Sequence, residues 1–404
     1  MVNVGIDLHK TQFTICVRSR RKGNGFAKYP TTQEGYQAFL RQAAEWQGKG
    51  EIVRVAVEST GNTRYFKNRM EEAGIGVTVI NPSKFKVVNE SVKKTDKHDA
   101  ATIAEFLEKD MLPESQLCSR ESEQLRRLLK VRETLVTSEV VIKNQIHGLL
   151  TSEGMEDVKG SLQSKKGRQQ VLDALKAYEN GLVAQPLFET IERLEENINR
   201  IEKQLRSLVQ GDRMVELLMT IPGCGEICSW TIRAYTDDIK RFANPKKYAS
   251  FAGLAPWVQN SNETIHHGSI TKRGPKELRT AIVQVVMGLR RMKEKTFSWR
   301  FMQRYEAMKK SKGSGKAIIA TARKVAVVIW NMLTDDVEFE LAKMIDKKLE
   351  KKSESMSGSV GMAKEALEEG QRKPVKNQDE KKSEGVRKSV KVSGVASRKI
   401  KKVG

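Results

Sequence analysis

The first 110 residues alternate between strand-like and helix-like patterns, and this alternation constrains the fold more than any other feature of the chain. Strand-like segments show period-two alternation or short apolar runs, whereas the helix-like segments are longer and more polar. In chain order, the expected elements are strands at 3–10 and 11–19, a helix at 31–46, a strand at 52–60, a helix at 62–74, a strand at 76–82 and a helix beginning near residue 96. Strands interleaved with helices predict an α/β layer fold, with the first two strands able to form a hairpin.

The pattern becomes helical and charged from about residue 114 to 212. Within it, apolar residues recur at alternating spacings of four and three, which is typical of a coiled-coil seam. They are Leu187, Ile191, Leu194, Ile198, Ile201, Leu205 and Leu208. Two interpretations carry equal weight: an intramolecular hairpin with the helix expected at 123–150, and an arm for self-association. The segment 152–167 between these helices is expected to form a flexible elbow.

A second compact, mostly helical unit is expected at 213–335, and the remaining residues differ sharply in composition. Residues 350–404 contain no aromatic residue and are rich in Lys, Ser, Glu and Gly. Such a segment buries too little apolar surface to fold alone and is expected to be a disordered basic tail. The sequence therefore predicts an α/β domain at 1–112, a helical or coiled-coil segment at 113–212, a mostly α-helical domain at 213–348 and the tail at 349–404.

The charge balance points to a polyanionic partner. The chain of 404 residues carries 73 Lys and Arg against 50 Asp and Glu, a formal net charge of +23. Nucleic acid fits this charge better than a membrane surface, because no apolar run reaches the ~20 residues that span a bilayer. The N-terminus runs directly into strand-like sequence rather than a signal peptide. Four scattered cysteines read as reduced core thiols rather than a zinc site, as expected for a cytoplasmic protein.

Four acidic residues stand at unusual positions in this basic chain. Asp7 lies in the first strand, on the face opposite its apolar residues, together with His9. Glu58 ends an apolar strand, where open α/β sheets expose functional groups. Asp96 and Asp99, at i and i+3, share one helical face.

Helix capping and metal binding are the two explanations for these acids. Thr95 or Asp96 could serve as N-cap, and acids suit the positive end of a helix dipole. Capping leaves Asp7 and Glu58 unexplained, whereas a metal site accounts for all four acids. Carboxylate oxygens suit Mg²⁺ or Mn²⁺, and two such ions about 3.5 to 4 Å apart can stabilise both oxygens of a phosphodiester exchange.

The blocks "GIDLHK", "VAVESTG", "INPSKFK" and "KTDKHDA" resemble the signature of the DEDD insertion-sequence transposases related to the Piv invertase. Further blocks, "IPGCGEICSWTIRA", "YASFAGLAPWV" and "GSITKRGPKELRTAIVQ", resemble the C-terminal transposase domain of that family. The resemblance covers about residues 1–335, in the family's order. It implies that the N-terminal α/β domain is RuvC-like, of the ribonuclease H type. It also implies that the metal-binding acids are Asp7, Glu58, Asp96 and Asp99. The intervening His98 is expected to face solvent.

The family is thought to use a C-terminal serine as DNA nucleophile, and the resemblance places this role on Ser261, after the "GLAPWVQN" turn. Asn262 stands where the family usually has glycine, so Ser269 is a rival position. The alternative is that these hydroxyls cap a turn or contact backbone phosphates.

Basic and aromatic residues surround these serines. Lys272, Arg273 and Arg279 are expected to contact phosphates without reading sequence. The tryptophans are expected to be packing residues, and Trp257 is the one to test for base stacking. His9 is expected to support the metal site or to be merely polar rather than to bind metal. The turn in "IPGCGEICSW" either offers N–H groups to a phosphate or is a helix packing corner.

The resulting hypothesis is a DNA transposase or site-specific recombinase of an insertion sequence, cutting and rejoining DNA with Mg²⁺ or Mn²⁺. The resemblance further implies a noncoding guide RNA from the same element, and recombination implies a homo-oligomer, a dimer or tetramer. One alternative is a metal-dependent Holliday-junction endonuclease of the ribonuclease H fold, with water as nucleophile. The other is a basic scaffold without enzymatic activity.

Overall fold

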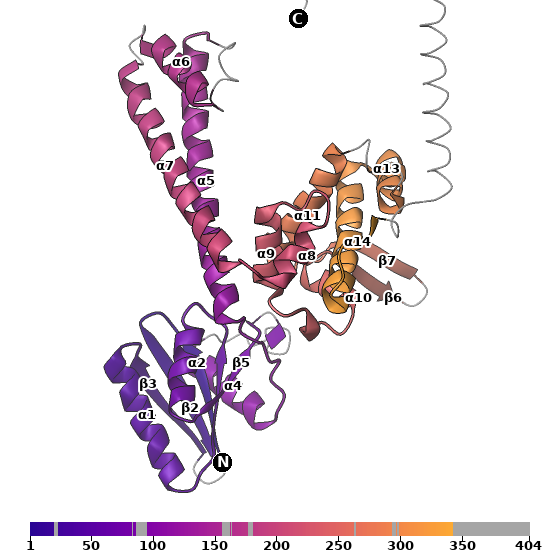
Figure 1. Ribbon diagram of the computed structural model, residues 1–404. Coiled ribbons are helices and arrows are strands. Elements are labelled where there is room, and N and C mark those ends of the chain that lie inside the picture. The colour runs from indigo at the N-terminus through magenta and orange to yellow at the C-terminus, as the bar shows by residue number, and fades with distance from the viewer. Residues whose placement is uncertain are drawn as a thin grey trace, which may run out of the picture.

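Figure 1 shows the computed structural model of the chain, with an α/β region at the N-terminus, two long projecting helices and a helical C-terminal region. The structure describes residues 1–19, 23–82, 84–85, 95–155, 162, 164–176, 181–261, 264–292, 296 and 299–341. The tail expected at 349–404 and residues 156–161 of the expected elbow lie outside the described residues.

A five-stranded mixed sheet organises the N-terminal region. Its strands are β1 (Val2–Leu8), β2 (Gln12–Ser19), β3 (Gly23–Pro30), β4 (Val53–Glu58) and β5 (Gly76–Ile80), in the order β3-β2-β1-β4-β5. The first three strands pair antiparallel, and β4 and β5 continue the sheet in parallel with β1. The predicted hairpin and α/β fold class are confirmed. The edge strand β3 was not predicted, since its glycines and polar residues carry no clear alternation.

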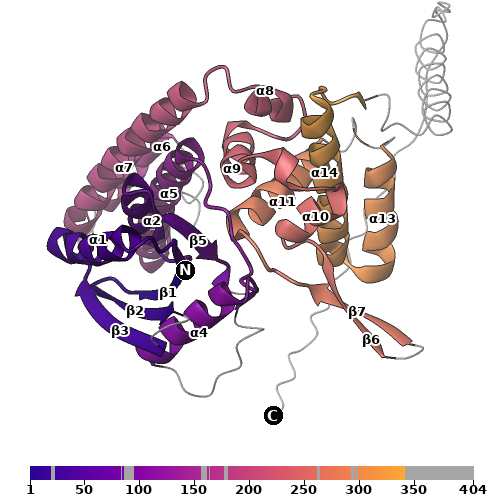
Figure 2. The same cartoon turned by 90° about the horizontal axis from the view of Figure 1, so that it is seen from below.

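Helices cover the sheet on both faces, as Figure 2 shows from below. On one face, α1 (Gln33–Gly48) and α2 (Thr63–Glu72) pack aromatic side chains against the apolar residues of β1, β2 and β4. The other face is covered by α4 (Asp96–Glu108), which packs on β1, β2 and β4. Its buried residues meet small side chains, Ala56 of β4 and Cys16 of β2.

The long helices form an intramolecular hairpin. Helix α5 (Arg120–Ser152) packs along α7 (Gly181–Leu208), with α6 (Lys165–Lys176) at the far end (Figure 1). Part of the predicted seam of α7 is used within the chain, because Ile191 and Leu205 are fully buried, whereas Leu208 at its end is 44% exposed, contrary to the prediction. Arg132 Nε of α5 donates to Glu202 Oε1 of α7 over 2.7 Å, which fixes the register between the two helices. Of the two interpretations, the hairpin is the one that the structure shows.

The C-terminal region is mostly helical, as predicted. It comprises α8 (Arg213–Met219), α9 (Glu226–Thr236), a 3₁₀ turn η2 (Ile239–Arg241), α10 (Pro245–Phe251), strands β6 (Pro256–Ser261) and β7 (Thr264–Ile270), α11 (Lys276–Arg291), α13 (Arg300–Lys312) and α14 (Ser314–Asp335). The antiparallel hairpin β6–β7 was not predicted. The "IPGCG" turn is tightly packed, because a β-carbon at Gly223 or Gly288 would overlap the other glycine's backbone. This contact favours the packing-corner interpretation of that turn.

Helix α14 is long and apolar enough by composition to cross a membrane, although Arg323 and Lys324 interrupt its apolar run. Its buried residues, from Ala317 to Leu333, belong to the core of the C-terminal region. The cysteines are free thiols, and burial raises the pKa of Cys224 to about 12. Cys16 and Cys224 are buried as predicted, whereas Cys118 and Cys228 are only half-buried.

The start of α5 is joined to the C-terminal region by a polar contact. Asp237, which follows α9, accepts hydrogen bonds from the backbone N–H and the hydroxyl of Ser119 and from the hydroxyl of Ser122. Arg233 of α9 donates to the same Ser122 hydroxyl over 2.9 Å. Arg126 Nε donates to the carbonyl of Ala234 over 2.9 Å. The helical hairpin is therefore anchored at its base to α9.

Candidate active site

Asp7 and Glu58 stand side by side at the carboxyl ends of parallel strands. Ile6 of β1 pairs with Val57 of β4, so the next residue of each strand is the acid. Val57 is buried against α1 and α2, and successive side chains of a strand alternate between faces. Both acids therefore lie on the face that α4 covers.

Close packing of α4 brings two further acids to this edge of the sheet. At Gly5, a β-carbon would overlap the carbonyl oxygen of Ala100 and the backbone nitrogen of Ala104. The absence of a side chain at Gly5 lets α4 lie directly on β1. Asp96 and Asp99 in the first turn of α4 consequently face the end of β1.

Capping of α4 is performed by a neighbouring residue. Thr95 Oγ1 accepts a hydrogen bond from the backbone N–H of His98 over 3.2 Å. Thr95 is therefore the N-cap, and neither Asp96 nor Asp99 is needed for that role. His98 itself is exposed, as expected.

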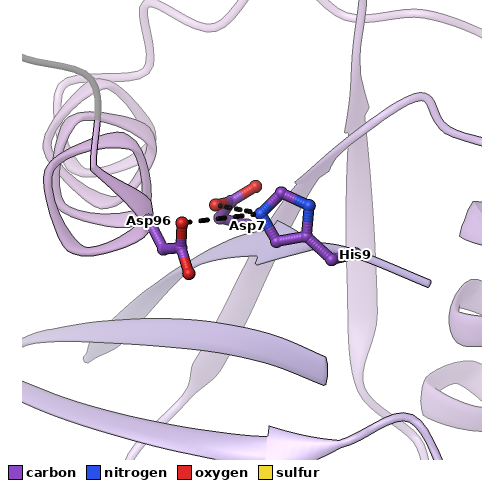
Figure 3. Close-up of side chains that lie close together, drawn as sticks. All are labelled: Asp7, His9 and Asp96. Atoms are coloured by element: carbon purple, nitrogen blue, oxygen red, sulfur yellow. Dashed lines mark hydrogen bonds and ion pairs between the residues drawn. The ribbon is translucent and has the colours of Figure 1, made fainter. Parts of the chain in front are cut away.

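His9 connects two of the acids, as Figure 3 shows. Its Nε2 lies 3.0 Å from Asp7 Oδ2 and 3.7 Å from Asp96 Oδ1. One ligand atom from each of these three residues fits within 4.8 Å of the others, a spacing compatible with one metal ion. The carbonyl of His9 accepts from Asn62 Nδ2 over 3.0 Å, which ties the loop after β1 to the start of α2. His9 is therefore in direct contact with Asp7 and lies near Asp96.

Electrostatics link the four acids, which we call the acid cluster: Asp7, Glu58, Asp96 and Asp99. Burial raises the pKa of Asp7, the Asp96 and Asp99 carboxylates raise it further, and the contact with His9 offsets part of this effect. Burial also raises the pKa of Glu58, and the charges of Asp7 and Asp99 add to that shift. Negative charges that destabilise one another in this way are relieved by a cation. The cluster offers hard oxygen donors, which Mg²⁺ and Mn²⁺ prefer.

Two residues near the acid cluster were missed at the sequence level. Lys28 Nζ lies 3.5 Å from Asp96 Oδ2, and Gln12 Nε2 lies 3.5 Å from the same oxygen. The only signal in the sequence would have been the pairing register, which joins Lys28 to Thr14 and Thr14 to Asp7. That register was not predictable because β3 itself was not expected.

The C-terminal candidates gather on hairpin β6–β7 and the turn that follows it. Ser261 is the last residue of β6, and Ser269 lies exposed in β7. Both views place this hairpin apart from the five-stranded sheet (Figures 1 and 2). Within one chain, the structure therefore does not bring the predicted serine to the acid cluster.

The turn after β7 is tightly built and basic. Lys272 and Arg273 are exposed, and Lys272 adopts a left-handed backbone with φ of 53°. Arg279 Nη1 donates to the carbonyl of Lys272 over 3.3 Å. Gly274, with φ of 99°, packs where a β-carbon would overlap the carbonyl of Phe251. The three predicted basic residues thus form one surface on a fixed turn.

Trp257 is presented next to this turn by an irregularity of the hairpin. Pro256 pairs with Ile270 and Val258 with His267, so two residues of β7 stand opposite Trp257. Such bulges redirect side chains. Trp257 is 51% exposed, and its ring lies against Gly268.

Comparisons with known proteins give one consistent result. A family model for DEDD transposases of the IS110 type matches residues 4–154, and a model described as "Transposase IS116/IS110/IS902 family" matches residues 215–301. The chain is 27% identical to the transposase of insertion sequence element IS1111A of Coxiella burnetii, over 69% of this chain and 77% of that protein. A probable family 20 transposase of Pseudomonas aeruginosa is 25% identical over 69% of this chain and 83% of its own length.

A recombinase is also among the similar proteins. The pilin gene-inverting protein of Moraxella bovis is 24% identical over 83% of this chain and 97% of its own length. The acid cluster falls inside the first family match and the basic turn inside the second.

Proposed function

This chain belongs to the IS110 family of insertion-sequence transposases, and from this premise we propose how its residues cut and rejoin DNA. Transposases catalyse DNA strand cleavage and transfer, and DNA is therefore the substrate. The observation that carries the proposal is the convergence of the acid cluster from β1, β4 and α4. The N-terminal domain is RuvC-like, of the ribonuclease H type, and the order of its five strands with acids at the ends of β1 and β4 supports this assignment.

The acid cluster holds divalent metal, Mg²⁺ or Mn²⁺. Asp7, Glu58, Asp96 and Asp99 supply the oxygen donors, and the pKa values of Asp7 and Glu58, raised by burial and by the neighbouring carboxylates, support a site that favours a cation. When bound, the metal lowers the barrier by stabilising the charge that develops on the phosphate oxygens. His9 orients Asp7 and Asp96 through its Nε2 contacts, a supporting role next to the ligands.

Ser261 is the proposed nucleophile. Its hydroxyl oxygen attacks the scissile phosphorus, a phosphorus–oxygen bond of the DNA breaks, and the departing DNA oxygen takes up a proton. The reverse exchange joins a new strand and releases the serine. Ser269 remains the rival on the neighbouring strand.

A complete active site needs the acid cluster and the serine together. Because hairpin β6–β7 lies apart from the sheet within one chain, we propose that the two parts meet in a homo-oligomer, a dimer or tetramer around paired duplexes (Figures 1 and 2). A guide RNA made from the same element would share the basic surface. The division into 1–112, 113–212, 213–348 and 349–404, and action in the cytoplasm, belong to the same proposal.

The basic turn forms the nucleic-acid interface next to the nucleophile. Lys272, Arg273 and Arg279 neutralise backbone phosphates, which fixes the strand without reading its sequence. Trp257 stacks on an unpaired base beside them. The exposure of Trp257, Lys272 and Arg273 supports this arrangement.

Trapping of a covalent adduct tests the proposal. Wild-type protein is incubated with labelled DNA of the element's ends and Mn²⁺, and then denatured; a labelled protein band is expected. Ser261→Ala is expected to abolish the adduct, Ser269→Ala to retain it, and Asp99→Asn to abolish it with the serine intact. Cleavage without an adduct in wild type would instead identify a Holliday-junction-type endonuclease, which uses water as nucleophile. Transposition that persists in Asp7→Asn and Asp99→Asn, with no adduct and no cleavage by the wild-type protein itself, would leave only a basic scaffold.

A further inference from the structure

We propose that Lys28 is a further active-site residue, which neutralises Asp96 in the metal-free protein and binds a DNA phosphate once metal has taken that carboxylate. The inference rests on the proposed function of the acid cluster. It concerns a strand, β3, that carries none of the residues proposed so far.

The pairing register places Lys28 on the same face as the acid cluster. Asp7 of β1 pairs with Thr14 of β2, and Thr14 pairs with Lys28 of β3. Paired residues of neighbouring strands point to the same side of a sheet. The row Asp7–Thr14–Lys28 therefore runs across three strands toward the first turn of α4.

The Lys28 side chain reaches into the cluster. Its Nζ lies 3.5 Å from Asp96 Oδ2, although the side chain is 50% exposed. Within the described part of the chain, Lys28 is the only lysine or arginine that forms an ion pair with any of the four acids. The other partners of Asp96 are Gln12, which is neutral, and His9.

The alternative is that this contact is an ordinary surface ion pair, which contributes little to stability. Two observations favour a role in the site. The partner is one of the acids proposed to hold metal. The row also contains the hydroxyl of Thr14, which is fully buried and has no hydrogen-bond partner among the residues that the structure describes, so an ordered water is expected beside this row.

The chemistry follows from the competition of two cations for one carboxylate. Metal and the Lys28 ammonium both stabilise the charge of Asp96, so each weakens the hold of the other. The released ammonium, on a flexible four-carbon stem, can then bind a phosphate oxygen as a point charge. Lys28 should thus oppose metal binding in the free protein and favour the DNA complex.

Two measurements on full-length Lys28→Gln test these opposite effects. Calorimetric titration with Mn²⁺ in the absence of DNA should show affinity increased about threefold or more, because a competing charge is gone. Strand cleavage at saturating Mn²⁺ should fall about tenfold, mainly through weaker DNA binding. Lys28→Arg keeps the charge and should restore much of the cleavage.

Lys97→Gln is the matched control. Lys97 lies next to Asp96 on α4, but its ammonium lies over the Phe26 ring, 5.8 Å from the centroid. Its removal changes net charge equally and should alter neither measurement. Thermal unfolding of all variants verifies that the fold is retained.

Unchanged Mn²⁺ affinity or unchanged cleavage in Lys28→Gln would overturn the inference. Equal effects of Lys28→Gln and Lys97→Gln would also overturn it, because they would show that the loss of one positive charge, rather than the position of Lys28, causes the change. If Mn²⁺ binds wild type and Asp99→Asn with equal affinity, the proposed metal site itself is wrong. This comparison does not involve the Lys28 variants, so it separates failure of the metal site from failure of the Lys28 proposal.

Discussion

The carbonyl oxygen of Ala100 in α4 lies so close to Gly5 of β1 that any β-carbon at that position would overlap it. This contact sets how closely α4 approaches the sheet. Asp96 and Asp99 occupy the first turn of the same helix, and Asp7 lies two residues beyond Gly5. The spacing of the acid cluster therefore depends on a residue that carries no functional group.

Replacement of Gly5 by alanine tests this dependence. Overpacking at a buried contact should lower the free energy of unfolding by about 1–3 kcal/mol. The displaced helix should also weaken Mn²⁺ binding about tenfold, a loss that calorimetric titration can detect, because metal ligands must be held to within a fraction of an ångström.

Gly76→Ala is the control for this substitution. Gly76 also lies in a strand, β5, but a β-carbon there would meet no atom of the described residues within 4 Å. It should leave metal affinity unchanged. Equal effects of the two substitutions would show that α4 does not depend on the contact at Gly5.

Much of the N-terminal fold was predictable because its signals are local. Period-two alternation in β1 and β2 and the apolar run of β4 reflect burial on one or both faces, which sequence records directly. Strand β3 could not be predicted, since it pairs only with β2 at the sheet edge and its glycines mask any period. Hairpin β6–β7 was missed for the related reason that it projects from a helical region.

The positions of the four acids in the fold were predictable, but their surroundings were not. Asp7 and Glu58 could be assigned to strand ends, and Asp96 and Asp99 to a helix start, from local pattern alone. Which residue supports them depends on pairing between distant segments. Lys28 is an example, since its position follows from the β1–β2–β3 register.

Protonation of the acid cluster should make stability depend on pH and on metal. The pKa of Glu58 is raised by burial and by Asp7 and Asp99, so the folded state binds protons more readily than the unfolded state. Stability without metal is therefore greatest below the unfolded pKa and falls as pH rises through the folded pKa. The neutral variant Glu58→Gln should accordingly be more stable than wild type near neutral pH without metal, and equal to it near about pH 3.

Addition of Mn²⁺ should make wild type more stable than Glu58→Gln near neutral pH, because wild type gains stability by binding metal and Glu58→Gln gains less. Denaturant unfolding across the pH range, with and without Mn²⁺, measures both effects. The exposed Glu45→Gln on α1 serves as control and should show neither. A Glu58→Gln variant that is less stable than wild type without metal would contradict the assignment of repulsion in the cluster.

The contact between Asp237 and the start of α5 should lose its contribution to stability as pH falls, whereas that of Glu58 is lost as pH rises. Burial raises the pKa of Asp237, but the hydrogen bonds from Ser119 and Ser122 outweigh it and hold the pKa below its ordinary value. The contribution of Asp237 is therefore present above the unfolded pKa and is lost as pH falls through the folded pKa. Asp237→Asn should reduce the free energy of unfolding by about 1–3 kcal/mol at neutral pH, with the difference shrinking toward strongly acidic pH.

Asp110→Asn is the matched control for this anchor. Asp110 also adopts a positive φ, of 53°, but its side chain is 72% exposed in a pair with Arg54. Its replacement should change stability by less than about 0.5 kcal/mol. A pH-independent difference for Asp237→Asn would show that shape rather than charge is lost at the anchor.

Trp257 should discriminate unpaired from paired DNA. Stacking on one base is worth about 1–3 kcal/mol, so Trp257→Ala should weaken binding of single-stranded DNA by roughly tenfold or more, and Trp257→Phe should weaken it less. Duplex binding should change little, because paired bases are not free to stack on the ring. Lys272→Gln should instead weaken both forms and lower the salt dependence by about one charge.

Fluorescence polarisation with matched oligonucleotides at several salt concentrations separates these effects. Tyr65→Ala is the control, because Tyr65 is also 51% exposed but lies on α2 beside the sheet. It should leave both affinities unchanged. Equal losses for single-stranded and duplex DNA in Trp257→Ala would mean that the ring supports the hairpin rather than a base, since Gly268 packs directly against it.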